Sequence, residues 1–207
     1  MKDQERSGRP ASGYNRREFL RGSSAAAAAT ALATGPGLAA PKDEPKKSAV
    51  AAPGLHYILL NVNGSDHSVK VEPRMTLLEV LRYQLGLTGA KPVSADGSSG
   101  ASTVWVEDRL ASASTTLAME CVGKKVRTVE SLGGAEPDAV PLAFVHQDAQ
   151  QCGFCTPGFV VAVRAFLDKN PQASEAEIRA GLNGNLCRCG TYANVVQAAL
   201  EVVKGGA

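Results

Sequence analysis

The chain has 207 residues, of which 44% are hydrophobic and 20% charged, a globular composition with room for one large or two small domains. Residues 1–40 hold six of the 22 Lys and Arg residues and three of the 20 Asp and Glu residues, so the remaining 16 basic and 17 acidic residues give a net charge of −1. A nearly neutral body offers no basic face for phosphates, which argues against nucleic acid as a partner.

The N-terminal segment has the features of an export signal. Arg16–Leu20 reads RREFL, the core of a twin-arginine signal, and an Ala-rich run, Ser23–Ala33, follows it. That run is too short and too weakly apolar to anchor the protein in a bilayer. We therefore interpret residues 1–40 as a twin-arginine signal peptide and expect a periplasmic protein with no stable membrane insertion. Residues 41–55, which mix Pro, Lys and Ala without periodicity, are expected to form a linker.

The ordered chain is expected to begin with a hairpin. Tyr57–Val62 and His67–Val71 are short β-prone runs, and Asn63-Gly64 between them is a strong turn signal because both residues tolerate positive φ. Thr76 and Glu79 have the spacing of a capping box, which starts a helix with leucines along one face.

A loop rich in Gly and Ser spans residues 93–102, and β-prone segments follow it at Thr103–Val106 and Lys125–Val129. Strands combined with one helix indicate a small α+β domain over residues 56–133, which ends at a hinge near Gly133–Pro137.

The pattern after the hinge is helical, and residues 138–204 are expected to form an all-α unit of four helices. In the second helix, Thr156 is predicted to be the capping residue and Pro157 the first helical position. The expected helices are Ala139–Ala149, a helix after Thr156 that extends to about Leu167, a third from a capping box at Ser174 to Leu182, and Tyr192–Val203.

Four of the five cysteines form two close pairs at loops between these helices. Cys152 and Cys155 have Cys-x-x-Cys spacing, Cys187 and Cys189 have Cys-x-Cys spacing, and a predicted helix follows each pair. The amide N–H groups at a helix start stabilise thiolates, and four thiolates are the ligand set of a [2Fe–2S] cluster. Zinc and disulfides are open alternatives, although Cys-x-Cys is unusual for a zinc site. Cys121 lies outside both pairs and is expected to be a small buried hydrophobic residue.

Two motifs around these cysteines carry a family resemblance. The segments QCGFCTPG (151–158) and NGNLCRCGTYAN (183–194) closely resemble the small iron–sulfur subunits of molybdenum hydroxylases, the xanthine oxidase/aldehyde oxidoreductase family. The resemblance covers roughly residues 56–204, and the signal peptide makes the chain most similar to periplasmic aldehyde oxidoreductase small subunits.

The resemblance implies a plant-type ferredoxin-like β-grasp domain followed by an all-α four-helix domain, each with its own [2Fe–2S] cluster. It implies that Cys152, Cys155, Cys187 and Cys189 bind the cluster of the helical domain, near the molybdopterin cofactor of a large partner subunit. Arg188, between two of these cysteines, is expected either to tune the potential of that cluster or to pair with the partner surface.

The chain departs from the family pattern in the first domain. The ferredoxin spacing Cys-x₄-Cys-x₂-Cys…Cys is kept, but serine occupies all four expected positions: Ser94, Ser99, Ser102 and Ser114. A hydroxyl is a hard, weakly acidic donor, whereas these clusters require soft thiolates. We therefore expect no cluster here, and a loop that closes through bonds from hydroxyls to the backbone.

The function implied is an electron-transfer subunit with no substrate site of its own. A large molybdopterin-binding subunit would oxidise an aldehyde or N-heterocycle, and the electrons would leave through the single cluster, to a flavin subunit or another carrier. Two alternatives remain: a structural or scaffolding subunit, and a free-standing ferredoxin-like carrier.

Overall fold

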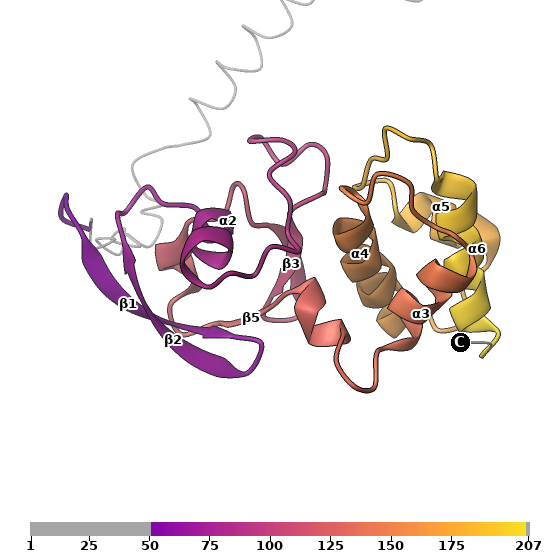
Figure 1. Ribbon diagram of the computed structural model, residues 1–207, viewed down its shortest axis with the longest axis horizontal. Coiled ribbons are helices and arrows are strands. Elements are labelled where there is room, and N and C mark those ends of the chain that lie inside the picture. Colours follow the sequence, from indigo (N-terminus) through magenta and orange to yellow (C-terminus); the bar gives the residue numbers. More distant parts are fainter. Residues whose placement is uncertain (1–50, 206–207) are drawn as a thin grey trace, which may run out of the picture. The chain divides into compact units, whose positions relative to one another are not determined.

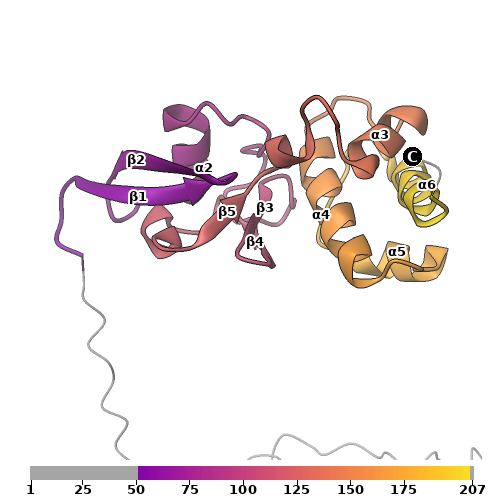
Figure 2. The same ribbon diagram turned by 90° about the horizontal axis from the view of Figure 1, so that it is seen from below.

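The computed structural model describes residues 51–205; the predicted signal peptide and most of the predicted linker lie outside them. Five strands form one mixed sheet in the order β2-β1-β5-β3-β4, and four longer helices, α3 to α6, follow in the chain (Figures 1 and 2). The combination of a mixed sheet and helices confirms the α+β class in its coarse form. No helix among the described residues is long and apolar enough to cross a membrane.

The predicted hairpin is confirmed. β1 (His56–Val62) and β2 (Ser65–Val71) are antiparallel, and Asn63 and Gly64 take positive φ angles of 52° and 83° in the turn. In this twisted two-residue turn both positions need the left-handed region, which explains the Asn-Gly sequence.

The rest of the sheet pairs around β5 (Lys125–Arg127), which is parallel to β1 and antiparallel to β3 (Thr103–Val106). The sheet ends at β4 (Arg109–Ser112), which no sequence pattern indicated. Its four residues are mainly polar or exposed, so they carry no alternation of apolar side chains.

The first helix differs from the expected α-helix. The capping box at Thr76 and Glu79 is present, but the α-helical part, α2, covers only Leu77–Glu79 and continues as a π-helix, η1 (Val80–Gln84). The Gln84 side chain donates to the Lys70 carbonyl oxygen at 2.8 Å and accepts from the Lys70 N–H at 3.1 Å. These bonds hold the last turn against β2, a tertiary contact that a helical pattern cannot reveal.

Two 3₁₀ turns complete the first half of the described chain, η2 (Ala118–Cys121) and η3 (Val129–Leu132). The helices of the second half are α3 (Ala139–His146), α4 (Thr156–Lys169), α5 (Glu175–Gly181) and α6 (Tyr192–Val203). All four were predicted, and their ends lie within a turn of the expected ones.

The apolar residues form two separate cores. One lies between the sheet and α2–η1 and includes Leu60, Val62, Leu77 and Leu81. The other joins the four helices around Phe159 and Val161, and it also takes in Trp105 of β3, which is only 4% exposed. The Arg127 guanidinium stacks over the Trp105 ring at 4.5 Å. Trp105 is therefore a core residue, and it packs β3 against α4.

Candidate metal centre

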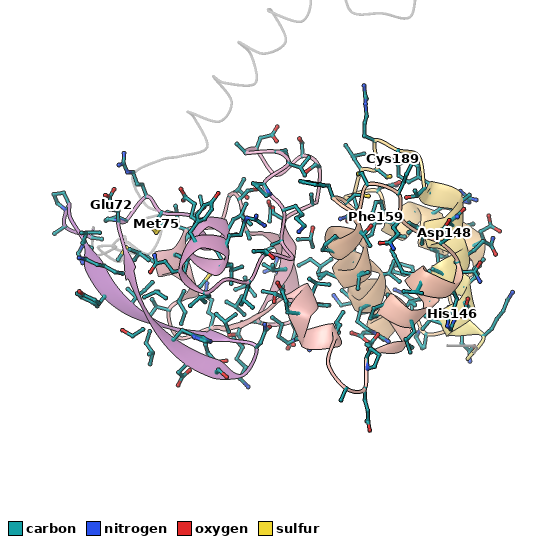
Figure 3. All side chains as sticks on the ribbon, in the orientation of Figure 1. Glu72, Met75, His146, Asp148, Phe159 and Cys189 are labelled. Atoms are coloured by element: carbon teal, nitrogen blue, oxygen red, sulfur yellow. The ribbon has the colours of Figure 1, made fainter. Side chains whose placement is uncertain are left out.

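The four paired cysteines lie in two loops that the fold brings together at the starts of α4 and α6. Cys155 immediately precedes α4, and Cys187 and Cys189 belong to the loop before α6. Figure 3 shows Cys189 in the loops at the upper ends of the helices and Phe159 in the upper part of α4. Gly153 and Gly190 have φ angles of 83° and 84°, which let the first loop turn sharply between Cys152 and Cys155 and the second between Cys189 and α6.

The thiols make cross-loop pairs, and no disulfide joins any of the five cysteines of the described chain. Cys155 and Cys187 influence each other's pKa, and so do Cys152 and Cys189, so the thiols of the two loops are neighbours in pairs. Among residues 51–205, no group of three or more Cys, His, Asp or Glu side chains is already arranged to hold a metal ion. Two sulfur pairs from two loops fit a group with two metal ions better than one zinc ion, because each iron of a [2Fe–2S] cluster takes two protein thiolates.

In the inner pair, Cys155 and Cys187, one thiol ionises with difficulty and the other ionises readily. Burial, followed by the hydrogen bond with Cys187, raises the pKa of Cys155 to about 12. Burial is the largest single influence and acts against the Cys187 thiolate, but hydrogen bonds from Thr191, Cys155 and the Gly190 backbone together outweigh it and lower that pKa to about 7. Without metal, Cys155 therefore keeps its proton and donates to Cys187.

The outer pair, Cys152 and Cys189, is exposed, and the pKa values of its two thiols are likewise shifted in opposite directions. The hydrogen bond from the Phe154 N–H, with a smaller contribution from Cys189, lowers the pKa of Cys152. A backbone bond involving Cys152 favours the Cys189 thiolate, but the side-chain bond with Cys152, burial and nearby negative charge together raise the pKa of Cys189. In each pair, one thiol forms the thiolate more readily than the other, and a bound metal must displace the protons that remain.

Donors around Cys187 fix its position. The Thr191 hydroxyl and N–H donate to Cys187 Sγ at 3.2 and 3.5 Å, and the Cys187 N–H donates to the Tyr192 hydroxyl oxygen at 2.8 Å. The Tyr192 ring meets Phe159 edge to face at 6.1 Å. Thr191 and Tyr192 belong to the second of the two motifs that carry the resemblance, but nothing in their spacing assigned them these contacts.

The five cysteines are not equivalent. Cys121 is fully buried in the core of the sheet, where burial raises the pKa of its thiol, as expected for a small hydrophobic residue. A hollow of about 400 Å³ includes Cys152, Cys155 and Cys187, and its rim is mostly apolar: Val93, Ala101, Phe154, Leu186 and Tyr192, with Ser99 and Arg188.

The serine loop, Val93–Ser102, closes without sulfur. Ser94 and Ser99 hydroxyls hydrogen-bond at 2.7 Å, and the Ser94 hydroxyl also accepts from the Ser99 N–H at 3.0 Å. Ser102 and Ser114 hydroxyls bond at 3.0 Å, and Ser112, which the sequence analysis did not single out, bonds to both. The expected bonds between hydroxyls and the backbone are confirmed, and bonds between hydroxyls add to them.

The serine loop contacts the Cys187 loop directly. The Leu186 N–H donates to the Ser99 carbonyl oxygen at 3.0 Å, and the buried Asn185 side chain donates to the Gly100 carbonyl oxygen at 2.9 Å. The sequence did not predict this contact, because hydrogen bonds to main-chain carbonyls leave no trace in residue identity.

Comparisons with known proteins agree with this chemistry. Residues 128–200 match the family described as "[2Fe-2S] binding domain", and residues 13–33 match the twin-arginine translocation pathway signal sequence. The chain is 37% identical over 142 residues to "Nicotine 6-hydroxylase small subunit" of Paenarthrobacter nicotinovorans, covering 69% of this chain and 86% of the relative.

Two further relatives cover similar or larger parts. "Aldehyde oxidoreductase iron-sulfur-binding subunit PaoA" of Escherichia coli (strain K12) is 35% identical, over 92% of this chain and 88% of its own. The solved structure of quinoline 2-oxidoreductase from Pseudomonas putida 86 matches with a TM-score of 0.70 and 35% identity, over 73% of this chain and 96% of the matched one.

The fold, the paired thiols and these similarities define an iron–sulfur protein that transfers electrons within an oxidoreductase complex. The chain belongs to the [2Fe–2S] small subunits of the molybdenum hydroxylase family, which includes aldehyde oxidoreductases and hydroxylases of N-heterocycles. Small subunits of this kind serve a larger catalytic partner, and the signal sequence directs this one to the twin-arginine export pathway.

Proposed function

We propose that the chain binds one [2Fe–2S] cluster on Cys152, Cys155, Cys187 and Cys189 and carries electrons from the molybdenum cofactor of its large partner subunit. The observation that supports this most is the meeting of four thiols from two loops, in pairs, at the starts of two helices. The bound cluster would supply a carrier that accepts and returns one electron at a time.

The chain's own residues would hold the cluster and limit its contact with water. The thiolates would be the ligands, and Thr191 and Tyr192 would keep Cys187 in place through the bonds described above. The side chains of Phe154 and Leu186 on the rim are 56% and 54% exposed. Because apolar groups gather there beside an electron-transfer site, we propose that the large subunit covers this face.

We propose two domains after the signal peptide (1–40) and linker (41–55). Residues 56–133 would be a plant-type ferredoxin-like β-grasp domain, and residues 138–204 the helical [2Fe–2S]-binding domain. Two separate hydrophobic cores, one for the sheet and one for the helices, support this division.

We propose that the first domain has lost the second cluster of the family. Ser94, Ser99, Ser102 and Ser114 offer only hydroxyls, and these are satisfied by one another and by backbone N–H groups. Four neutral alcohols would have to lose their protons to replace four thiolates, which is unfavourable near neutral pH. The cluster of the helical domain would then be the last carrier in this chain, before a flavin subunit or another acceptor.

The substrate of the complex would be an aldehyde or an N-heterocycle, since the similar proteins are named for aldehydes, nicotine and quinoline. Export by the twin-arginine pathway supports a periplasmic complex.

Iron and acid-labile sulfide per chain in the purified protein test this proposal. We expect about two of each, with an EPR signal that appears on reduction. Four of each would show that the serine loop binds a cluster after all, and none would leave a scaffolding subunit. Copurification of a large molybdenum-containing subunit distinguishes the proposed subunit from a free-standing carrier.

A further inference from the structure

Two threonines stand at the starts of the two helices that follow the cysteine pairs, and neither caps its helix. Thr191 is the N-cap of α6, a position where a threonine side chain ordinarily accepts from the backbone, yet no such bond forms. Thr156 was expected to be the N-cap of α4. That prediction was wrong: Cys155 takes the N-cap position, and Thr156 is the first helical residue.

The Thr191 hydroxyl hydrogen-bonds to a sulfur atom instead. It donates to Cys187 Sγ at 3.2 Å, and the Thr191 N–H adds a second bond to the same atom at 3.5 Å. Hydrogen bonds to a sulfur ligand stabilise negative charge on it, and this is one of the ways in which a protein sets the potential of an iron–sulfur cluster.

The Thr156 hydroxyl makes no such hydrogen bond to any of residues 51–205. Its Oγ1 atom is buried and finds no hydrogen-bond partner there, one of two side-chain atoms of the described chain in that state. Buried hydroxyls in folded proteins are nearly always bonded, because their transfer out of water is otherwise unfavourable. Pro157, the next residue, has no N–H, and Cys155 is the residue before.

We infer that the Thr156 hydroxyl donates to a sulfur atom that the bound [2Fe–2S] cluster itself brings to the site, whereas the Thr191 hydroxyl donates to Cys187 Sγ, and that the two threonines together raise the reduction potential of the cluster. This inference rests on the proposed cluster and deepens it. Reduction adds one negative charge that spreads over the sulfur atoms, so each O–H donor stabilises the reduced form more than the oxidised form. The two residues are positioning residues, since the cysteines hold the metal.

The role of each hydroxyl can be tested in the full-length protein with Thr156→Val and Thr191→Val, which keep the size of the side chain and remove the donor. We expect both variants to retain about two iron atoms per chain. A redox titration followed by the EPR signal of the reduced cluster should give a lower midpoint potential in each. At the wild-type midpoint, the ratio of reduced to oxidised cluster should fall on the order of threefold to tenfold, the effect of one hydrogen bond.

Thr156→Ser and Thr191→Ser are the matched controls, because they keep the hydroxyl and lose only a methyl group. Both should stay near the wild-type potential, which a purely structural role of the threonine would not predict. Should valine at position 156 prevent iron loading, Thr156→Ala, which adds no methyl group beside the sulfurs, gives a second measurement with the same expected decrease.

Two outcomes can be told apart. Iron-loaded Thr156→Val and Thr156→Ala with the wild-type potential would overturn the inference and leave the proposed cluster intact. A wild-type protein without iron or sulfide would remove the proposed function itself.

Discussion

The serine loop lies against the cysteine loops, yet the two kinds of loop differ in how their polar side chains are satisfied. In the serine loop every hydroxyl at an expected ligand position has a partner, and the bonds run from Ser94 to Ser99 and from Ser102 to Ser114. In the cysteine loops, Cys155 keeps a thiol proton that a metal would displace, and the nearby Thr156 hydroxyl has no partner within the described chain. A loop whose polar side chains are all hydrogen-bonded can close without a ligand, whereas a buried polar group without a partner indicates a bound group.

The serine loop also supports one of the cysteine loops. The serine loop supplies two carbonyl oxygens, of Ser99 and Gly100, to the segment that carries Cys187. It therefore helps to position the loop that carries Cys187.

Exchange of one sulfur for oxygen in a cysteine loop should have the largest effect. In Cys187→Ser, iron should fall well below about two atoms per chain, because an alcohol at this position is a much poorer ligand than the thiolate. Visible absorption and turnover of the reconstituted complex with its acceptor should be lost together. Cys121→Ala, in the core of the sheet, is the control and should keep its iron. Unchanged turnover in Cys187→Ser would show that electrons bypass the site.

The reverse exchange, of cysteine for serine in the serine loop, should raise the iron content instead of lowering it. A variant with cysteine at all four positions, Ser94, Ser99, Ser102 and Ser114, should bind a second cluster and raise iron to about four atoms per chain. The same variant with Ser114 left unchanged is the control and should stay near two. If the fourfold variant stays near two as well, the loop has lost the backbone geometry for a cluster and not only its sulfur atoms.

Sequence reasoning predicted the parts of the fold that local chemistry decides. The Asn63-Gly64 turn, the capping boxes at Thr76 and Ser174 and the periodicity of α4 and α6 each act over a few residues, so their patterns survive in the sequence. β4 and the π-helical turn were missed, because strand pairing and the bonds between Gln84 and Lys70 stabilise them across the chain.

The candidate site divides in the same way. Spacing alone placed the four cysteines in two pairs before helices, and the serines in a loop of ferredoxin spacing. It could not show that the thiols pair across the loops, that Thr191 donates to Cys187 or that Asn185 reaches Gly100. Those contacts depend on how segments far apart in the chain meet, up to 85 residues for Asn185 and Gly100, which the residue types do not encode locally.

The contact between the serine loop and α4 can be strained by a single methyl group. A Cβ atom at Gly158 of α4 would lie 2.3 Å from the Gly100 carbonyl oxygen and 3.1 Å from Ala101 Cα, so backbone would have to move. Gly158→Ala should therefore lower the free energy of unfolding by about 1–3 kcal/mol. Gly184→Ala is the matched control in the neighbouring loop, since a Cβ there meets nothing within 4 Å. Urea unfolding of both variants measures the difference in stability. Equal stability would mean that the serine loop and α4 do not pack this closely.

The smallest expected effect comes from the side chain of Asn185, which crosses between the loops. Asn185 is 6% exposed, and its Nδ2 donates to the Gly100 carbonyl oxygen at 2.9 Å. Asn185→Ala removes this donor and leaves a buried carbonyl oxygen with one partner fewer, which should cost about 1–2 kcal/mol of unfolding free energy. Asn183→Ala, an exposed asparagine two residues earlier, should cost much less. Because the lost bond anchors the Cys187 loop, Asn185→Ala should also release iron to a chelator faster than Asn183→Ala. Equal release rates would mean that the serine loop does not help to hold the cysteines.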